Sequence, residues 1–258
     1  MIINKYRTAI LCLLLICFLP HSRINAQSVK PEFEVTTESL NLFDKSRNRS
    51  VPVAIYTPSD KKNTKQKVVI FSHGYGENKG GDNLIYSYLT ENLAAHGYFV
   101  ASIQHELPTD DLIPMTGIIQ VVRRPFWDRG ADNILFVMNE LKKSRPELDF
   151  RNITLIGHSN GGDMTALFPQ KYPGVVGKII TMDNRRMALP RTKRPNVYSL
   201  RSSDLPADEG VLPELEDQKK FGIKIITLKN TKHNEMDNDA NDAQRKEING
   251  YVLNFLKD

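Results

Sequence analysis

One serine lies in a pattern that suits a nucleophile. Gly157-His158-Ser159-Asn160-Gly161 matches G-x-S-x-G, which marks a sharp turn between a strand and a helix that holds the serine hydroxyl above the end of a sheet. The two glycines leave room around the strained backbone of the serine. The preceding residues, Ile153–Ile156, predict the buried strand that such a turn requires. Ser159 is therefore the candidate nucleophile.

His233 is the candidate base for Ser159. A serine hydroxyl is a weak nucleophile unless a base lies within hydrogen-bond reach and a third group orients that base. Where the strand–turn–helix pattern supplies the serine, the acid and then the histidine follow it along the chain. His233 is the only histidine after Ser159, and it follows the predicted strand Ile223–Leu228.

Three aspartates are candidates for the acid. Asp204 follows the predicted strand Asn196–Leu200, one strand before that of His233. Asp208 reaches the same place if its loop folds back, and Asp183 ends the strand before that. We prefer Asp204 and keep Asp208 and Asp183 as alternatives, because strand ends predicted from one sequence carry an error of a few residues.

A nucleophilic serine also needs an oxyanion hole, which consists of two N–H groups aimed at the developing charge. Asn160, directly after the serine, is the first candidate donor. The second is expected in the loop after the strand Val68–Ser72, where Tyr75 lies within His73-Gly74-Tyr75-Gly76. We expect the N–H groups of Tyr75 and Asn160 to form the hole.

The elements that position these residues alternate between strands and helices. This alternation predicts an α/β fold with a mainly parallel sheet and helices on both faces. The first two strands suit an antiparallel N-terminal edge, where Pro52 is tolerable. We expect strands at Glu34–Phe43, Val51–Tyr56, Val68–Ser72, Tyr98–Ile103, Ile153–Ile156, Gly177–Met182, Asn196–Leu200 and Ile223–Leu228. Helices are expected at Asn83–His96, Phe126–Lys143, Gly162–Phe168, Pro213–Lys220 and Asn241–Leu256.

Taken together, these motifs resemble those of the α/β-hydrolases. The resemblance runs from Val51 to Lys257 and is carried by His73–Gly76, Gly157–Gly162, Ser203-Asp204 and His233. Within the superfamily, the His-Gly-x-Gly loop and the Arg-x-x-x-Val-Pro-Val segment that starts at Arg47 are similar to the dienelactone hydrolase and platelet-activating-factor acetylhydrolase branch. Asn160 departs from the apolar residue that esterases often carry there, which alters the side chain but not the donated N–H.

The resemblance implies hydrolysis of carboxylic esters by Ser, Asp and His through an acyl-enzyme. Two alternatives stay open: a serine peptidase or amidase on the same fold, and a non-catalytic binding protein that keeps the fold. The complete set of Ser159, Asp204 and His233 argues against a binding protein. We expect a small-molecule ester substrate, with neither a cofactor nor a metal ion.

The segments expected around the site are a short insert after Asp183 and an apolar piece before Trp127. Caps on this fold usually follow the strand that ends here at Asp183, and Asn184–Pro195 is too short for a helical lid, so no large cap is expected. This insert holds Arg185, Arg186, Arg191, Lys193 and Arg194. They attract an anionic substrate in one interpretation and pair with acids in a solvated loop in the other. The apolar piece Ile113–Val122, with Trp127, lines an acyl groove or packs against the sheet.

Residues 1–26 predict a cleaved signal peptide. Lys5 and Arg7 precede the apolar run Thr8–Leu19, and Ile24-Asn25-Ala26 resembles a cleavage site. The run is too short to span a bilayer comfortably, so no stable membrane anchor is expected. We therefore expect a periplasmic or secreted protein with one domain over residues 27–258.

Removal of residues 1–26 would change the composition. Cys12 and Cys17, the only cysteines, lie there, which leaves no disulfide and no cysteine ligand. The formal charge of +5 loses the three positive charges of Lys5, Arg7 and Arg23 and becomes +2. A charge this near neutrality gives no reason to expect nucleic acid as a partner. The oligomeric state is not predictable from these features.

Overall fold

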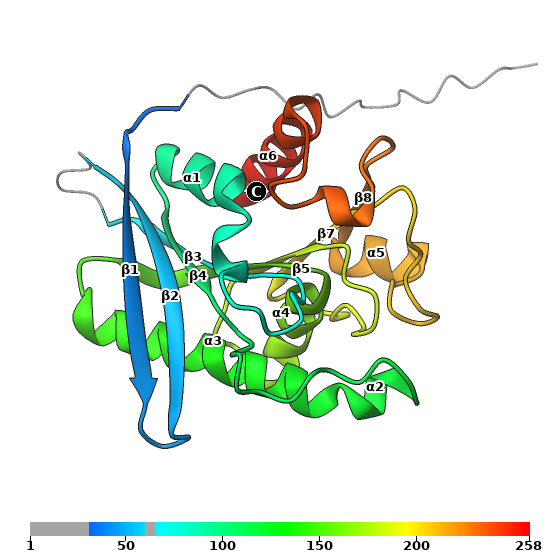
Figure 1. The fold of residues 1–258 in the computed structure, drawn as a ribbon. Coiled ribbons are helices and arrows are strands. Elements are labelled where there is room, and N and C mark those ends of the chain that lie inside the picture. The colour runs from blue at the N-terminus through cyan, green and yellow to red at the C-terminus, as the bar shows by residue number, and fades with distance from the viewer. Residues whose placement is uncertain (1–30, 60–64) are drawn as a thin grey trace, which may run out of the picture.

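An eight-stranded sheet forms the centre of the protein (Figure 1). The computed structural model describes residues 31–59 and 65–258, so the expected signal peptide lies outside the described residues. The strands lie in the order β1-β2-β4-β3-β5-β6-β7-β8. Their bounds are β1 Val35–Asp44, β2 Arg49–Pro58, β3 Lys67–Ser72, β4 Phe99–Ile103, β5 Asp149–His158, β6 Lys178–Met182, β7 Asn196–Arg201 and β8 Lys224–Thr227.

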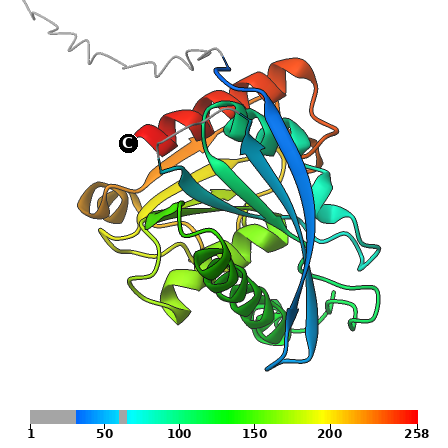
Figure 2. The ribbon, with the colours of Figure 1, turned by 90° about the vertical axis from the view of Figure 1, so that its left-hand side faces the viewer.

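The N-terminal hairpin forms one edge of the sheet (Figure 2). β2 pairs antiparallel with β1 and with β4, whereas the remaining neighbours pair in parallel. β1 has an exposed face, in keeping with its edge position, whereas all five residues of β4 are buried. The predicted sheet and its antiparallel N-terminal edge are therefore confirmed.

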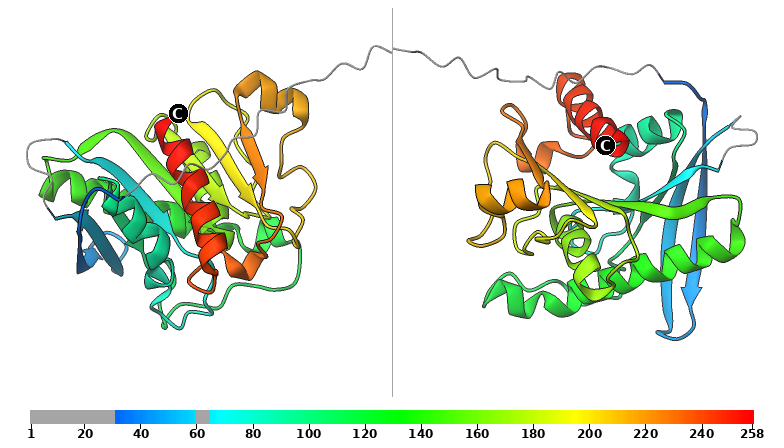
Figure 3. Two further views of the ribbon diagram at one scale, coloured as in Figure 1. Left: turned by 90° about the horizontal axis from the view of Figure 1, so that it is seen from above. Right: turned by 180° about the vertical axis from the view of Figure 1, so that it is seen from behind.

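Helices cover both faces of the sheet (Figures 1 and 3). α3 (Arg124–Ser144) and α4 (Ser159–Lys171) pack on one face, where Trp127, Ile134 and Leu167 lie in the same core cluster as Ile70 of β3. α1 (Ser87–Ala95) and α6 (Asp242–Lys257) pack on the other face, which receives Phe71. Successive residues of β3 thus fill opposite cores, since side chains alternate along a strand.

One predicted helix differs from the structure, and one apolar segment without a predicted structure forms a short helix. The stretch predicted as one helix, Asn83–His96, is divided into the short 3₁₀ helix η1 (Asp82–Leu84) and α1. Within η1, the Asn83 N–H donates to the Gln104 side chain at 3.3 Å instead of extending a helical ladder. The apolar piece Ile113–Val122 forms only α2 (Ile119–Val122), which precedes α3 directly.

The remaining helices lie late in the chain. These are α5 (Leu215–Phe221) and the 3₁₀ helix η2 (His233–Glu235), both outside the main helical layers. Segment 183–195, between β6 and β7, contains neither helix nor strand, so the expectation of no large cap at this position is confirmed. Across the part of the chain that the structure describes, no helix has both the length and the apolar character needed to cross a membrane.

Candidate active site

The parallel strands bring their carboxyl ends to one edge of the sheet. Register pairs Ser72 with Gly157, His158 with Met182, and Met182 with Leu200. Residues that directly follow β3, β5, β6 and β7 therefore lie beside one another. The predicted site residues belong to these segments and to the loop after β8.

Ser159 lies on the sharp turn between β5 and α4. Its φ of 50° falls in the left-handed region, which few non-glycine residues occupy. A Cβ on Gly157 would lie 2.2 Å from the carbonyl oxygen of Gly161, and one on Gly161 would lie 2.3 Å from that of Ser72. Both contacts are with backbone that cannot move aside, so each position requires glycine.

His233 joins Ser159 to a carboxylate. The Ser159 Oγ lies 2.9 Å from Nε2 of His233, and Nδ1 of the same ring lies 2.6 Å from Oδ2 of Asp183. An ionised carboxylate only accepts, so Nδ1 carries the proton and Nε2 is left to accept the serine hydroxyl. This tautomer is the one that a general base for Ser159 needs.

Asp183 is buried and held on several sides. It is fully buried with φ 53°, and Ser202 donates to it through its backbone N–H at 3.0 Å and its hydroxyl at 2.7 Å. The guanidinium of Arg201 pairs with Oδ1 at 2.8 Å. Burial alone raises the pKa of the Asp183 carboxyl, but the bond with His233 and the Arg201 charge outweigh it, so this pKa lies below its usual range. Asp183 is therefore ionised at neutral pH.

The preference for Asp204 was wrong as to which carboxylate meets the histidine ring. The Asp204 carboxylate instead accepts the backbone N–H of His233 at 2.8 Å. Asp183 follows β6, the direct neighbour of β5, whereas Asp204 lies past the end of β7, one strand further from Ser159. Sequence alone places both aspartates near strand ends and does not reveal this difference in reach.

Asp208 does not contact His233 either. Its carboxylate pairs with Arg186 and accepts a hydrogen bond from Gln120 at 2.9 Å. Its backbone N–H donates to the carbonyl of Arg185 at 2.9 Å. Asp208 therefore holds the insert after β6 in place.

The two expected oxyanion-hole residues line the same cavity as Ser159 and His233. The neighbouring Gly74 N–H is already used, because it donates to the phenol oxygen of Tyr86 at 3.0 Å. The Tyr75 hydroxyl accepts the N–H of Ile113 at 3.2 Å and so fixes the loop over the cavity. Assignment of the hole to the N–H groups of Tyr75 and Asn160 stays a prediction.

The side chain of Asn160 has buried partners that the sequence did not reveal. Its Oδ1 accepts the indole N–H of Trp127 at 2.8 Å, and its Nδ2 donates to Glu106 at 3.0 Å. Burial raises the pKa of the Glu106 carboxyl. The polar residue after the nucleophile is thus fixed between α3 and the end of β4, and Trp127 packs against the sheet as one of its two interpretations expected.

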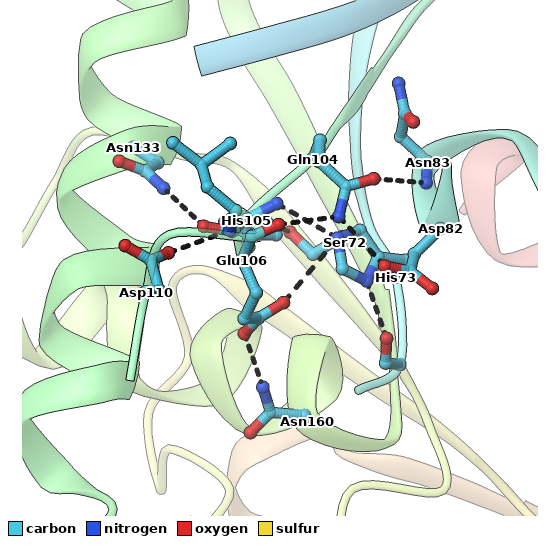
Figure 4. A network of polar contacts seen from close by, with 12 residues as sticks. Ser72, His73, Asp82, Asn83, Gln104, His105, Glu106, Asp110, Asn133 and Asn160 are labelled. Atoms are coloured by element: carbon cyan, nitrogen blue, oxygen red, sulfur yellow. Dashed lines mark hydrogen bonds and ion pairs between the residues drawn. The ribbon is translucent and has the colours of Figure 1, made fainter. Parts of the chain in front are cut away.

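A buried polar network connects Asn160 to the loop that carries Tyr75 (Figure 4). His73 lies 2.6 Å from the carbonyl of Gly74 through Nδ1, and its Nε2 accepts the N–H of His105 at 2.9 Å. Gln104 donates to Asp82 and to the carbonyl of Glu106, each at 2.9 Å. The ends of β3 and β4 are therefore held together beside the site. The sequence signal for this network was the run of polar residues directly after a buried strand.

The cavity at Ser159 has a volume of about 170 Å³. This is smaller than the roughly 300–1,000 Å³ of pockets for drug-sized ligands. Its walls consist of Tyr75, Ile113, Met115, Arg123, Ser159, Asn160, Asp163, Arg185, Arg186 and His233. Among residues 31–59 and 65–258, no three or more His, Cys, Asp or Glu residues form a group that could hold a metal ion.

Comparison with known families agrees with the sequence motifs. The model of the family "platelet-activating factor acetylhydrolase, isoform II" matches residues 31–110. That part contains the Arg47–Val53 segment and the His73–Gly76 loop but ends before Ser159. No curated protein matches the chain significantly.

Solved structures of esterases are similar to this chain over most of its length. Esterase Est22 has a TM-score of 0.63 at 13% identity, covering 88% of this chain and 82% of its own. A bacterial heroin esterase has a TM-score of 0.62 at 15% identity, with coverage of 90% and 86%. Esterase 2 of Thermogutta terrifontis, phosphonylated by cyclosarin, has 0.61 at 13% identity, with coverage of 84% and 91%. The chain has the α/β-hydrolase fold, as its motifs predicted.

Proposed function

We propose that this protein is a serine hydrolase that cleaves carboxylic esters through an acyl-enzyme on Ser159. The observation that carries the proposal is the hydrogen-bonded series from Ser159 through His233 to the buried Asp183, with contacts of 2.9 and 2.6 Å. The family match and the esterase structures support the choice of esters over other acyl compounds.

The geometry supports acylation in two steps. As the Ser159 Oγ forms a bond to the acyl carbon, His233 Nε2 takes the hydroxyl proton. The negative charge of Asp183 stabilises the resulting imidazolium. The N–H groups of Tyr75 and Asn160 would stabilise the tetrahedral oxyanion, where loss of one donor typically costs about 2.7–4 kcal/mol. His233 then gives its proton to the departing alkoxide oxygen, and the carbon–oxygen bond of the ester breaks.

Deacylation repeats these steps with water. His233 removes a proton from a water molecule that attacks the acyl carbon, and the Ser159 oxygen leaves and regains its proton. The products are a carboxylic acid and an alcohol, and the enzyme returns to its starting state. No cofactor is needed for this proton balance.

A fluorophosphonate probe tests the nucleophile. It should label the wild-type protein and fail to label Ser159→Ala, and intact-protein mass spectrometry should find one adduct. Unchanged labelling of Ser159→Ala would disprove the assignment. Parallel rates on a 4-nitrophenyl acyl ester and an aminoacyl 4-nitroanilide then separate an esterase from a peptidase, which would turn over the anilide far faster.

We also propose that the protein is exported after cleavage behind Ala26. The support is the sequence pattern of Lys5, Arg7 and the apolar run Thr8–Leu19. N-terminal sequencing of the protein from a periplasmic or culture-medium fraction should begin at Gln27. A chain that stays in the cytoplasm with Met1 intact would contradict export.

A further inference from the structure

The cavity beside Ser159 carries an excess of positive charge. Three of its lining residues are arginines, Arg123, Arg185 and Arg186, against a single carboxylate, Asp163. They come from distant parts of the chain: Arg123 directly follows α2 as its C-cap residue, and the other two lie in the insert after β6. The fold therefore brings together three like charges at the place where a substrate must sit.

Most of this charge is not neutralised by the protein. Arg186 pairs with Asp208, but no ion pair between described residues involves Arg123 or Arg185. Arg123 donates through Nε to the carbonyl of Pro114 at 2.8 Å, and Arg185 donates through Nε to that of Pro206 at 3.1 Å. These bonds orient both side chains and leave their charges unpaired.

Asp163 offsets at most one of the three arginine charges. Its Oδ1 is occupied by the backbone N–H groups of Arg186 and Met187, at 2.9 and 2.8 Å. Burial raises the pKa of its carboxyl to about 6, despite these bonds. The pKa of Arg123 is lowered, first by burial and then by the charge of Arg186. The arginines thus repel one another in a half-buried site, and an anion would relieve that repulsion.

We propose that the substrate is a small ester that carries an anionic group, such as a carboxylate, which binds to Arg123 and Arg185. The inference rests on the proposed ester hydrolysis and adds the substrate class. Guanidinium groups suit this task because they stay charged and present a planar set of donors that matches a carboxylate. The volume of about 170 Å³ limits the substrate to a short acyl or alcohol part.

Matched pairs of esters test the proposal. 4-Acetoxybenzoate against methyl 4-acetoxybenzoate places the charge on the alcohol side, and mono(4-nitrophenyl) glutarate against 4-nitrophenyl valerate places it on the acyl side. In the wild-type protein, kcat/KM for one charged ester should exceed that of its neutral partner by about tenfold or more, as expected for a charged hydrogen bond. Uncatalysed hydrolysis is subtracted in each case.

Variants connect that preference to the named side chains. Arg185→Gln and Arg123→Gln should each lower the charged-to-neutral ratio of kcat/KM by about tenfold. Asp163→Asn, which keeps an acceptor for the two backbone N–H groups, should raise the ratio. Arg191→Gln is the matched control, because Arg191 lies in the same insert but pairs with Asp217 at 3.3 Å outside this cavity. It should leave the ratio unchanged.

The failure of this inference is distinguishable from the failure of ester hydrolysis. Turnover of the neutral esters without preference for either charged ester, or a ratio unaffected by Arg185→Gln and Arg123→Gln, overturns the anionic substrate while the esterase stands. Calorimetry with monomethyl glutarate and Ser159→Ala protein measures the anion site without catalysis. Binding that is lost on adding Arg185→Gln supports the proposal, and no binding overturns it.

Discussion

Replacement of Asp183 by Asn tests the acid of the site most directly. The carboxylate lies 2.6 Å from Nδ1 of His233 and is fully buried, so solvent does not screen the interaction. An amide in its place favours the wrong tautomer of the ring, a change worth about 10⁴-fold in kcat. This corresponds to about 5.4 kcal/mol of lost transition-state stabilisation.

The same substitution affects stability through Arg201. The Arg201 guanidinium, 2.8 Å from Asp183, would become a buried charge without its partner. Removal of one partner from such a pair destabilises by about 3–5 kcal/mol. Thermal unfolding should therefore be measured for Asp183→Asn. If this variant does not fold, the double variant Asp183→Asn with Arg201→Met is used instead, because it removes both buried charges.

Asp204→Asn is the comparison that decides between the two aspartates. Asn at this position keeps an oxygen to accept the backbone N–H of His233, so kcat should fall by less than about tenfold. Hydrolysis of a 4-nitrophenyl ester by folded protein measures both variants. The reasoning is refuted if Asp183→Asn retains activity within tenfold of the wild type while Asp204→Asn loses it.

Three further substitutions probe the structure around the nucleophile. The pKa of Asp163 is raised to about 6 in the native state, whereas the unfolded chain releases this proton near pH 4. Binding of the proton therefore stabilises the native state fully below pH 4, and this stabilisation is lost as the pH rises through 6. The free energy of unfolding of Asp163→Asn, measured with urea, should thus rise by up to about 3 kcal/mol relative to the wild type between pH 4 and 7. A difference between the two proteins that does not change with pH would contradict this. Gly161→Ala would put a Cβ 2.3 Å from the carbonyl of Ser72, so fluorophosphonate labelling should be abolished, whereas full labelling would show that the turn adapts. Trp127→Phe leaves Asn160 Oδ1 without its donor and should lower the free energy of unfolding by about 1–3 kcal/mol. It should also lower kcat, and wild-type values for both quantities would contradict a positioning effect.

The sequence was sufficient wherever the information is local. The strand at β5, the glycines at 157 and 161 and the serine between them are neighbours in the chain, and their steric requirements allow one kind of turn. The order of Ser159 and His233 and the apolar runs of the sheet likewise predicted the α/β architecture and its antiparallel edge.

Contacts between distant segments had to come from the tertiary structure. The choice of Asp183 over Asp204 depends on β6 lying next to β5, together with the path of the loop that carries His233. The partners of Asn160 come from α3 and from the end of β4. Arg123 likewise lines the same cavity as Arg185 and Arg186 only because the fold brings α2 next to the insert after β6. The sequence determined which residue types are present and in which order. Packing determined which of them lie within hydrogen-bond distance, because a few ångströms decide whether two side chains interact.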